Sequence, residues 1–412
     1  MRNNNILIVD PFSTGALYAD AFTAQGYDVY CLISNEQVPA YLIGTLDKAK
    51  YKHLFYSYEE CVRFFSQHGL YIAVAGGETG VYFADKLNSL FKINANQASS
   101  SSIRRDKYLM QIALKENDLR HICSYEILSQ DQDLTKFLKY SSINSINRWI
   151  IKPLNSAGSD GVISFDSVEH IYAYLAQYNW QRDTAIGEKC RGLVLQEFIA
   201  GDEYVVDLVK SESKYFIASL CKYTKVGETG LVYHCLDIID PSDTKYNDLV
   251  QYAIECANAL ELVKGPMHME FMKDDKGFVM IEAGARLHGG VAPSFFKSCY
   301  EPHLLAYAVD SFLGKMFDCT YATKLREGRI VFLHVDSDGI MPMFEAQYLP
   351  KFESLTSYQG HKWFVPEGKP IPKTKSLFDC PGIIWLAHKD INIVNEDEKT
   401  IRDMFCFNSV TI

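Results

Sequence analysis

The sequence lacks long apolar runs, paired cysteines and any excess of positive charge. Its first apolar segment holds four consecutive residues, 6 to 9, before Asp10, and no other segment reaches the length of a membrane-spanning helix. The 11 cysteines are scattered singly. Without a CxxC pair or a Cys/His cluster at zinc spacing, they favour reduced thiols. We therefore expect a soluble, cytoplasmic protein with no membrane partner.

The charge balance excludes a further class of protein. A formal net charge of -10 does not suit a general binder of phosphate backbones, so we expect no nucleic-acid partner. The chain is 48% hydrophobic and 22% charged, without low-complexity tracts. Its 412 residues therefore suffice for two to three globular domains with large cores.

The pattern of apolar segments divides the chain into three parts. Residues 1–100 alternate short strands with helical segments, which predicts a parallel α/β sheet. The strands expected there lie at 6–10, 28–33 and 70–76. Residues 101–312 contain strands joined by short turns, so we expect an α+β core with antiparallel hairpins and a closing helix near 301–313. Residues 313–412 are again strand-rich.

Two carboxylates stand out in a hairpin that begins near residue 266. Period-two alternation places Met267, Met269 and Phe271 on one face of its first strand, and His268, Glu270 and Met272 on the other. If the turn centres near Lys276, Glu270 faces Glu282, an arrangement that a divalent cation would make tolerable. Mg²⁺ is the natural ion, with Mn²⁺ possible. Alternatively, Glu282 pairs only with Arg286 and Glu270 points to solvent, because a one-residue slip would separate the acids.

A loop rich in small residues follows another strand. Lys152 ends that strand, and backbone amides and hydroxyls at Ser156, Gly158 and Ser159 could surround phosphate oxygens. The loop is not a Walker A motif, since no GK[ST] follows and no helix opens there. An ordinary hairpin with a surface lysine is the alternative.

Two further segments carry polar groups suited to a nucleotide. Glu197, Phe198 and Ile199 end a strand whose backbone could read an adenine edge, and the carboxylate of Glu203 could hold ribose hydroxyls. Lys107 lies near the start of a predicted helix. A plain acidic hairpin and a solvated lysine explain the same residues. Asp10, Ser13 and Gly15 lack the GxGxxG spacing of a dinucleotide site, so we interpret them as a structural turn.

The order of these elements resembles the ATP-grasp superfamily over roughly residues 100–310. The stretches GGETGVYFADKL, RRDKYLM and IEAGARLHGG are similar to those of bacterial L-amino-acid ligases, which make dipeptides. The resemblance implies a pre-ATP-grasp domain over 1–100, an ATP-grasp core with central and lid subdomains over 101–312, and a strand-rich C-terminal domain over 313–412. It also implies a carboxylate–amine ligase that forms an acyl phosphate and releases ADP and phosphate.

The resemblance further implies a role for each matching residue. The residues implied for ATP are Lys107, Lys152, Ser156, Gly158, Ser159, Glu197, Phe198, Ile199 and Glu203. Those implied for Mg²⁺ are Glu270 and Glu282, and those for catalysis are Arg286 and Lys152. The substrate contacts implied are Arg286, His234, Gly289 and Gly290.

One position departs from the family pattern, and alternatives to the dipeptide ligase remain. Gly284 stands where the family usually has Asn as a metal ligand, which puts the metal stoichiometry in doubt. Another carboxylate–amine ligase, or a biotin-carboxylase-like enzyme acting on a different small acid, would share the core, although no Met-Lys-Met carrier stretch occurs. A non-catalytic ATP-binding module would not need Glu270, Glu282 and Arg286 together. The expected partners are two amino acids, of which Glu228 would favour a basic one, and a second copy of the chain in a homodimer.

Overall fold

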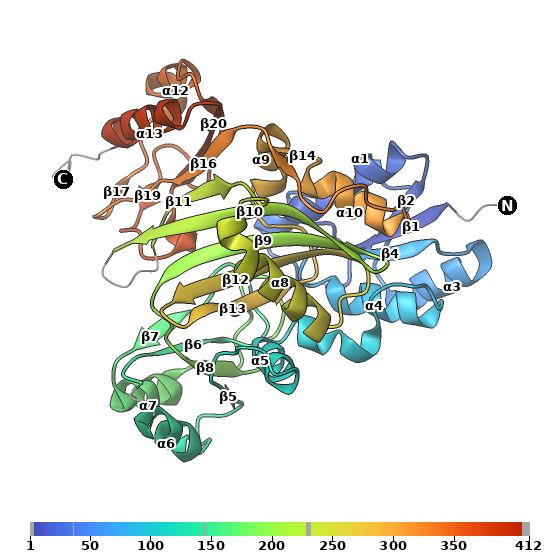
Figure 1. Cartoon of the computed structure of the whole chain (residues 1–412), viewed down its shortest axis with the longest axis horizontal. Coiled ribbons are helices and arrows are strands. Elements are labelled where there is room, and N and C mark those ends of the chain that lie inside the picture. Colours follow the sequence, from blue (N-terminus) through green and yellow to red (C-terminus); the bar gives the residue numbers. More distant parts are fainter. Residues whose placement is uncertain (1–3, 36, 144–145, 228–231, 406–412) are drawn as a thin grey trace.

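The structure, a computed structural model, describes residues 4–35, 37–143, 146–227 and 232–405. Its strands form a parallel sheet near the N-terminus, a small antiparallel sheet and a broad eight-stranded sheet that runs through the middle of the molecule (Figure 1). Among the described residues, no helix is long and apolar enough to cross a membrane. Glu228, the residue expected to favour a basic substrate, lies outside the described residues.

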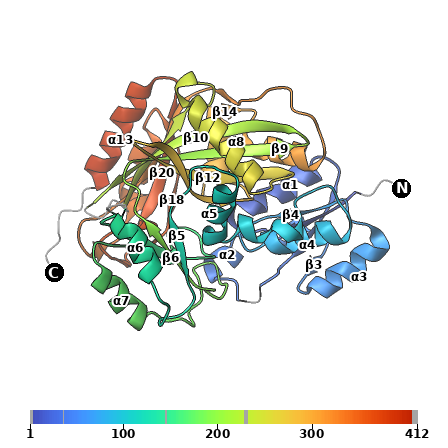
Figure 2. The ribbon, with the colours of Figure 1, turned by 60° about the horizontal axis from the view of Figure 1, so that its bottom comes forward.

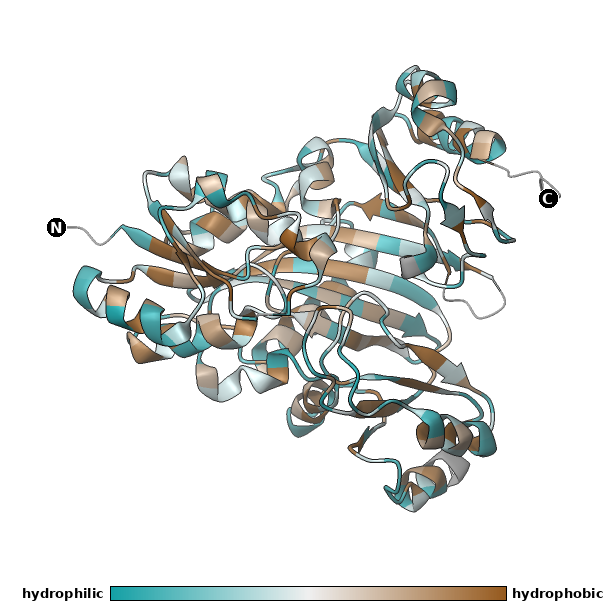
Figure 3. Ribbon diagram, turned by 180° about the vertical axis from the view of Figure 1, so that it is seen from behind, coloured by the Kyte–Doolittle hydropathy of each residue, from teal (hydrophilic) through white to brown (hydrophobic). Residues whose placement is uncertain are grey.

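The N-terminal sheet has the order β3-β2-β1-β4, and all of its pairings are parallel, as predicted. Its strands are β1 Asn5–Val9, β2 Asp28–Leu32, β3 Leu54–Phe55 and β4 Ile72–Ala75. Its helices are α1 Leu17–Thr23, α2 Ala40–Ile43, α3 Tyr58–His68 and α4 Val81–Leu90. The strands are largely brown in Figure 3, because their side chains are apolar on both faces. The two-residue β3 escaped prediction, since it is too short to show alternation.

The turn after β1 ties three segments of this sheet together. Asp10 has a φ of 51° and is fully buried. Its carboxylate accepts hydrogen bonds from the backbone and hydroxyl of Ser34, at 2.7 and 2.6 Å, and from the hydroxyl of Thr79, at 2.6 Å. These contacts agree with the interpretation of a structural turn.

The small sheet has the order β5-β8-β6-β7 and is antiparallel throughout. Its strands are β5 Ser124–Ile127, β6 Trp149–Pro153, β7 Ile163–Phe165 and β8 Leu193–Glu197, with helices α6 Thr135–Ile143 and α7 Val168–Gln177 beside them. Trp149, Ile151, Leu195 and Ile171 belong to a separate hydrophobic core under this sheet.

The large sheet has the order β13-β12-β9-β10-β11-β16-β20-β18, with antiparallel pairings throughout. Its strands are β9 Asp202–Ser211, β10 Lys214–Val226, β11 Val232–Ile239, β12 Gly265–Asp274, β13 Gly277–Gly284, β16 Glu327–Phe332, β18 Tyr358–Trp363 and β20 Gly382–His388. The strands of the last hundred residues thus extend the sheet of the core. The domain boundaries near 100 and 312 stay a prediction.

Helices cover the large sheet on both faces. They are α5 Lys107–Glu116, α8 Asn247–Ala259, α9 Ala292–Cys299, α10 Leu304–Phe312, α11 Phe344–Gln347, α12 Leu349–Glu353 and α13 Ile391–Phe405. Short 3-10 helices span Ser13–Ala16, Lys48–Lys50, Ala98–Ser100, Ser102–Arg104, Thr244–Tyr246 and Leu377–Asp379. Two-stranded pairs join β14 Tyr300–Glu301 to β15 Thr323–Lys324, and β17 Gly339–Ile340 to β19 Pro370–Ile371.

The two faces of β12 differ as its alternation predicts. Met267, Met269 and Phe271 pack in a core with α8 and with α5, which lies near β12 in Figure 2. His268, Glu270 and Met272 face the opposite way and line a cavity. Burial of the apolar face therefore fixes which side chains of this strand reach the cavity.

Candidate active site

A cavity of about 1300 Å³ lies where the three sheets meet. Its wall includes the loop after β4, the end of β6 with its following loop, and strands β9 to β13. Of the predicted site residues, the cavity brings together Lys107, Lys152, Ser156, Gly158, Ser159, Glu197, Phe198, Ile199, Glu203, Glu270, Glu282, Arg286, Gly289 and Gly290. These residues come from positions up to 183 apart in the sequence. His234 is not part of the wall.

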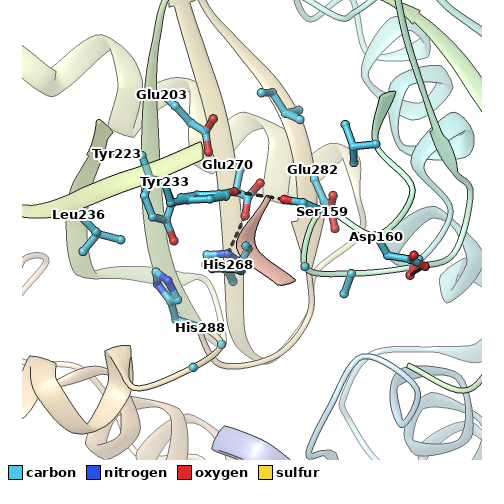
Figure 4. A pocket seen from close by; sticks show the side chains of 18 of the residues that line it. Ser159, Asp160, Glu203, Tyr223, Tyr233, Leu236, His268, Glu270, Glu282 and His288 are labelled. Carbon is cyan, nitrogen blue, oxygen red and sulfur yellow. Dashed lines mark hydrogen bonds and ion pairs between the residues drawn. The ribbon is translucent and has the colours of Figure 1, made fainter. Parts of the chain in front are cut away.

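The two predicted acids, Glu270 and Glu282, face each other directly across β12 and β13 (Figure 4). The reason differs in one detail from the expected one. The turn closes at Asp274 and Gly277, and Ile281 is an extra residue in β13, since the next pair toward the turn is Phe271 with Met280. This bulge, rather than a turn centred on Lys276, brings Glu282 opposite Glu270.

Glu270 is held as an anion by its neighbours. Burial opposes ionisation, but the hydrogen bond from His268 Nε2, at 3.4 Å, and the charges of His268, Lys225 and Lys152 lower the pKa of Glu270 to about 2. The ionised Glu270 and the facing carboxyl group of Glu282 lie on one half-buried face and offer oxygen ligands to a divalent ion.

Two lysines lie beside the acids. Asp106 caps α5 by accepting hydrogen bonds from Tyr108 and Leu109, which fixes Lys107 at the first turn of that helix. Lys107 Nζ lies 3.2 Å from Glu282 Oε1 and also donates to the carbonyl of Ser156. Burial lowers the pKa of Lys152 to about 8, although Glu282 acts in the opposite direction. A buried cation in this position attracts an anionic ligand.

The loop over residues 155–161 reaches across the cavity. Gly158 and Ser159 have φ values of 71° and 64°, a left-handed bend that side chains rarely adopt. Asp160 stabilises the bend, because it accepts hydrogen bonds from Ser156 Oγ, at 2.7 Å, and from Arg182. Ser159 Oγ then lies 3.4 Å from the hydroxyl of Tyr233 on β11 (Figure 4).

The expected nucleoside end of the cavity has a free acceptor. Glu203 on β9 pairs with Lys225 Nζ at 2.6 Å, while its Oε1 is buried and has no hydrogen-bond partner among the described residues. Burial raises the pKa of Glu203 despite Lys225. The side chain of Glu197 instead accepts a hydrogen bond from the backbone of Cys123, at 3.2 Å, so this segment offers the cavity mainly its backbone and the ring of Phe198.

Sequence reasoning assigned no role to one acid of this site, Glu78. Glu78 follows β4 at the carboxyl edge of the parallel sheet, where ligands commonly bind. That position in the sequence could have predicted it as a site residue. Glu78 Oε2 accepts a hydrogen bond from Arg286 Nε at 2.7 Å, and Oε1 lies 2.9 Å from Arg105 Nη1. A Cβ atom on Gly284 would lie 2.7 Å from Glu78 Oε2. The carboxylate of Glu78 therefore takes the space that a side chain at 284 would need.

A buried acid also links two histidines behind Glu270. Asp207 on β9 lies 2.9 Å from His268 Nδ1 and 2.9 Å from His288 Nδ1, and it accepts a hydrogen bond from Ser219. The three groups are close enough to hold a metal ion. However, both Nδ1 atoms already bond to the carboxylate, so we interpret the group as a hydrogen-bonded network that orients the two rings.

The structure places His234 outside the cavity. It is the extra residue of a bulge in β11, because Tyr233 pairs with Lys225 and Cys235 with Thr224. Tyr233 and Leu236 consequently face the cavity, while His234 Nε2 lies 3.6 Å from Glu398 on α13. Its assignment as a substrate contact has no support from this geometry and stays a prediction.

Comparison with known proteins agrees with this architecture. Residues 147–294 match the sequence model of a family described as the ATP-grasp domain. The chain has an ATP-grasp domain. It is 26% identical to dapdiamide A synthase of Enterobacter agglomerans, over 97% of this chain and 95% of that protein. The ATP-grasp fold is an ATP-binding fold, as expected.

Solved structures show the same fold over the whole chain. An L-amino acid ligase from Bacillus licheniformis superposes with a TM-score of 0.74 and 15% identity, and 98% of each chain is covered. An N5-carboxyaminoimidazole synthase from Aspergillus clavatus, in complex with ADP and 5-aminoimidazole ribonucleotide, superposes with a TM-score of 0.69 and 13% identity, over 98% of this chain and 99% of that chain. The family match over residues 147–294 and these superpositions confirm the predicted resemblance to ATP-grasp proteins and their fold.

Proposed function

We propose that this ATP-grasp enzyme joins two L-amino acids into a dipeptide through an acyl phosphate, releasing ADP and phosphate. The observation that carries the proposal is the cavity in which Glu270 faces Glu282 and which Lys107, Lys152 and Arg286 also line. The relatives named L-amino acid ligase and dapdiamide A synthase support it. The cytoplasmic location expected from the cysteines is part of the same proposal.

The free groups of the cavity fit ATP. The backbone of Glu197–Ile199 would contact the adenine, and the unpartnered Oε1 of Glu203 would accept a hydrogen bond from a ribose hydroxyl. Lys107 and Lys152 would neutralise the phosphates. Ser156, Gly158 and Ser159 would close over the phosphate oxygens, since their loop already extends across the cavity to Tyr233.

The carboxylate pair fits Mg²⁺. Glu270 and Glu282 supply two acidic oxygens on one face, and Mg²⁺ usually keeps one or two carboxylates with phosphate and water oxygens. A bound ion would neutralise charge on the β- and γ-phosphates. Gly284 offers no third ligand, and the neighbouring Glu78 is already bonded to two arginines.

The chemistry that follows needs positioning more than covalent help. The carboxylate of one amino acid attacks the γ-phosphate, which gives an acyl phosphate and ADP. An amine then attacks the acyl carbon. Arg286, whose Nε is fixed by Glu78, and the backbone amides of Gly289 and Gly290 would stabilise the negative oxygen of the tetrahedral species. The loop over 155–161 would exclude water from the acyl phosphate.

A second enzymatic function uses the same core. The structural likeness to an N5-carboxyaminoimidazole synthase fits another carboxylate–amine ligase, or a biotin-carboxylase-like enzyme, acting on a different small acid. The two proposals differ only in the acid and the amine, because the residues proposed for ATP and Mg²⁺ are the same.

The test is phosphate and ADP release from ATP and Mg²⁺ with each of the twenty L-amino acids, alone and in pairs, with mass spectrometry of the products. We expect release that depends on particular amino acids and a dipeptide of matching mass. ATP binding without turnover on any amino acid would contradict the dipeptide ligase. Other small acids, including bicarbonate, would then be tested with the same assay.

A further inference from the structure

The two histidines bonded to Asp207 differ at their second ring nitrogen. His268 has a carboxylate on both sides, with Asp207 at 2.9 Å from Nδ1 and Glu270 at 3.4 Å from Nε2. His288 has Asp207 at 2.9 Å from Nδ1, and its Nε2 has no hydrogen-bond partner in the described part of the chain. The rings are neighbours, with centroids 4.2 Å apart, and both residues line the cavity (Figure 4).

These contacts fix different protonation states. A carboxylate only accepts hydrogen bonds, so each Nδ1 bonded to Asp207 must carry a hydrogen. His268 meets a carboxylate at both ring nitrogens, so both nitrogens donate and neither is free to accept a proton. For His288, burial has the largest influence and lowers the pKa; Asp207 raises it, while His268 and Arg286 lower it. The ring of Phe296 on α9, the other neighbour, is uncharged.

We propose that His288 is the general base that accepts the proton of the attacking amine, and that Asp207 orients it. The inference rests on the proposed function. A ring with one nitrogen held by a buried carboxylate and the other free toward a cavity is the arrangement that prepares a histidine for proton transfer. His288 also lies two residues from Arg286 and next to Gly289, the groups proposed to surround the acyl phosphate.

The step balances without a further reactant. The amine nitrogen attacks the acyl carbon and forms the C–N bond, while one N–H proton passes to His288 Nε2. The tetrahedral species then collapses, the C–O bond to phosphate breaks, and phosphate leaves with the electron pair. The proton on Nε2 returns to phosphate or to solvent, which restores the uncharged ring.

The decisive experiment compares two nucleophiles on the variant His288→Asn. The asparagine amide can still donate a hydrogen bond to Asp207 but cannot accept a proton at neutral pH. With the amino-acid amine, we expect dipeptide formation to fall about 100-fold or more, the usual contribution of a general base. With hydroxylamine, which is largely uncharged at neutral pH and needs no base, hydroxamate formation should stay close to that of the parent enzyme. The dipeptide deficit should shrink as the pH rises.

Two further variants serve as a substitute for His288→Asn and as a matched control. His288→Gln, which also lacks a basic nitrogen, should show the same difference between nucleophiles if His288→Asn is too unstable to assay. His303→Asn is the matched control, because Asn also caps helices and should preserve the cap of α10 and both activities. Equal losses with both nucleophiles, or no loss with either, would overturn the assignment of His288. If the parent enzyme forms neither hydroxamate nor ADP with any amino acid, the proposed function fails, and the inference fails with it.

Discussion

The two walls of the cavity contribute different groups to the proposed site and are held by different means. The large sheet supplies Glu203, Glu270 and Glu282 from the neighbouring strands β9, β12 and β13, each fixed by register. The small sheet supplies Lys152 at a strand end and polar groups from the loop that follows it. The small sheet has its own hydrophobic core, and the β9–β13 part of the large sheet packs in another.

Lys107 and Ser159 are two of the residues whose side chains join these walls. Lys107 pairs with Glu282 and also donates to the carbonyl of Ser156 in the loop. Ser159 approaches Tyr233 on the opposite side. The acids thus stand on strands of the large sheet, while the groups proposed for phosphate stand on a smaller sheet with its own hydrophobic core. Changes to the acids should therefore act mainly on catalysis, and changes to the small sheet mainly on nucleotide affinity.

The largest expected effect comes from neutralising Glu270, one of the two facing acids on the large sheet. For Glu270→Gln we expect a fall in kcat of about 100- to 1000-fold, because the amide would hold Mg²⁺ more weakly and the positive charge that the ion supplies to the phosphates would be lost. Removal of Mg²⁺ with a chelator should have a comparable effect in the parent enzyme. Release of ADP measures both, with Glu116→Gln, an exposed acid at the end of α5, as the control. A Glu270→Gln variant with a tenth of parental turnover would contradict the proposed metal site.

The next effect tests Lys152, the lysine that the small sheet contributes to the cavity. Lys152→Met keeps the length of the side chain but removes its charge, so we expect the Kd of ATP to rise about tenfold with a smaller change in kcat. Because the pKa of Lys152 is lowered to about 8, the parent should bind ATP more weakly as the pH rises through that value. The variant should lack this dependence. Titration calorimetry across pH 7 to about 9 measures both; identical pH dependence in the two proteins would remove Lys152 from the phosphate site.

Local patterns predicted much of this site, and contacts between distant segments account for the rest. Alternation in β12 predicted which side chains reach the cavity, because one face of the strand must be buried. The bulge at Ile281, however, lies inside a regular apolar run and has no signal of its own. The bulge that turns His234 away from the cavity likewise has no recognisable signal in the sequence. Glu78 comes from another sheet, so only the three-dimensional fold brings it to Arg286.

An intermediate effect on activity is expected where the parallel sheet meets the large sheet, at Glu78 and Gly284. Gly284→Asn restores the residue type that the family usually has, but its Cβ would lie 2.7 Å from Glu78 Oε2. Since two arginines hold that carboxylate, we expect the pair with Arg286 to break and kcat/KM to fall about tenfold. Gly284→Ala separates the steric effect of the Cβ atom from the effect of an added metal ligand, because alanine has the Cβ atom but no ligating group. Higher activity for Asn than for the parent would show that a missing metal ligand limits the enzyme.

The smallest expected effect compares the neighbours Tyr233 and His234, which the bulge in β11 turns to opposite sides. Burial and then Arg402 lower the pKa of His234 to about 4, so its ring is uncharged at neutral pH and its contact with Glu398 is weak. His234→Asn should therefore leave kcat/KM within about twofold of the parent. Tyr233→Phe removes the 3.4 Å contact with Ser159 and should raise the KM for ATP, because the loop loses its anchor on the large sheet. In the reverse result, His234→Asn would raise the KM for an amino acid and Tyr233→Phe would leave the KM for ATP unchanged. That result would mean that β11 turns its other side to the substrates during turnover.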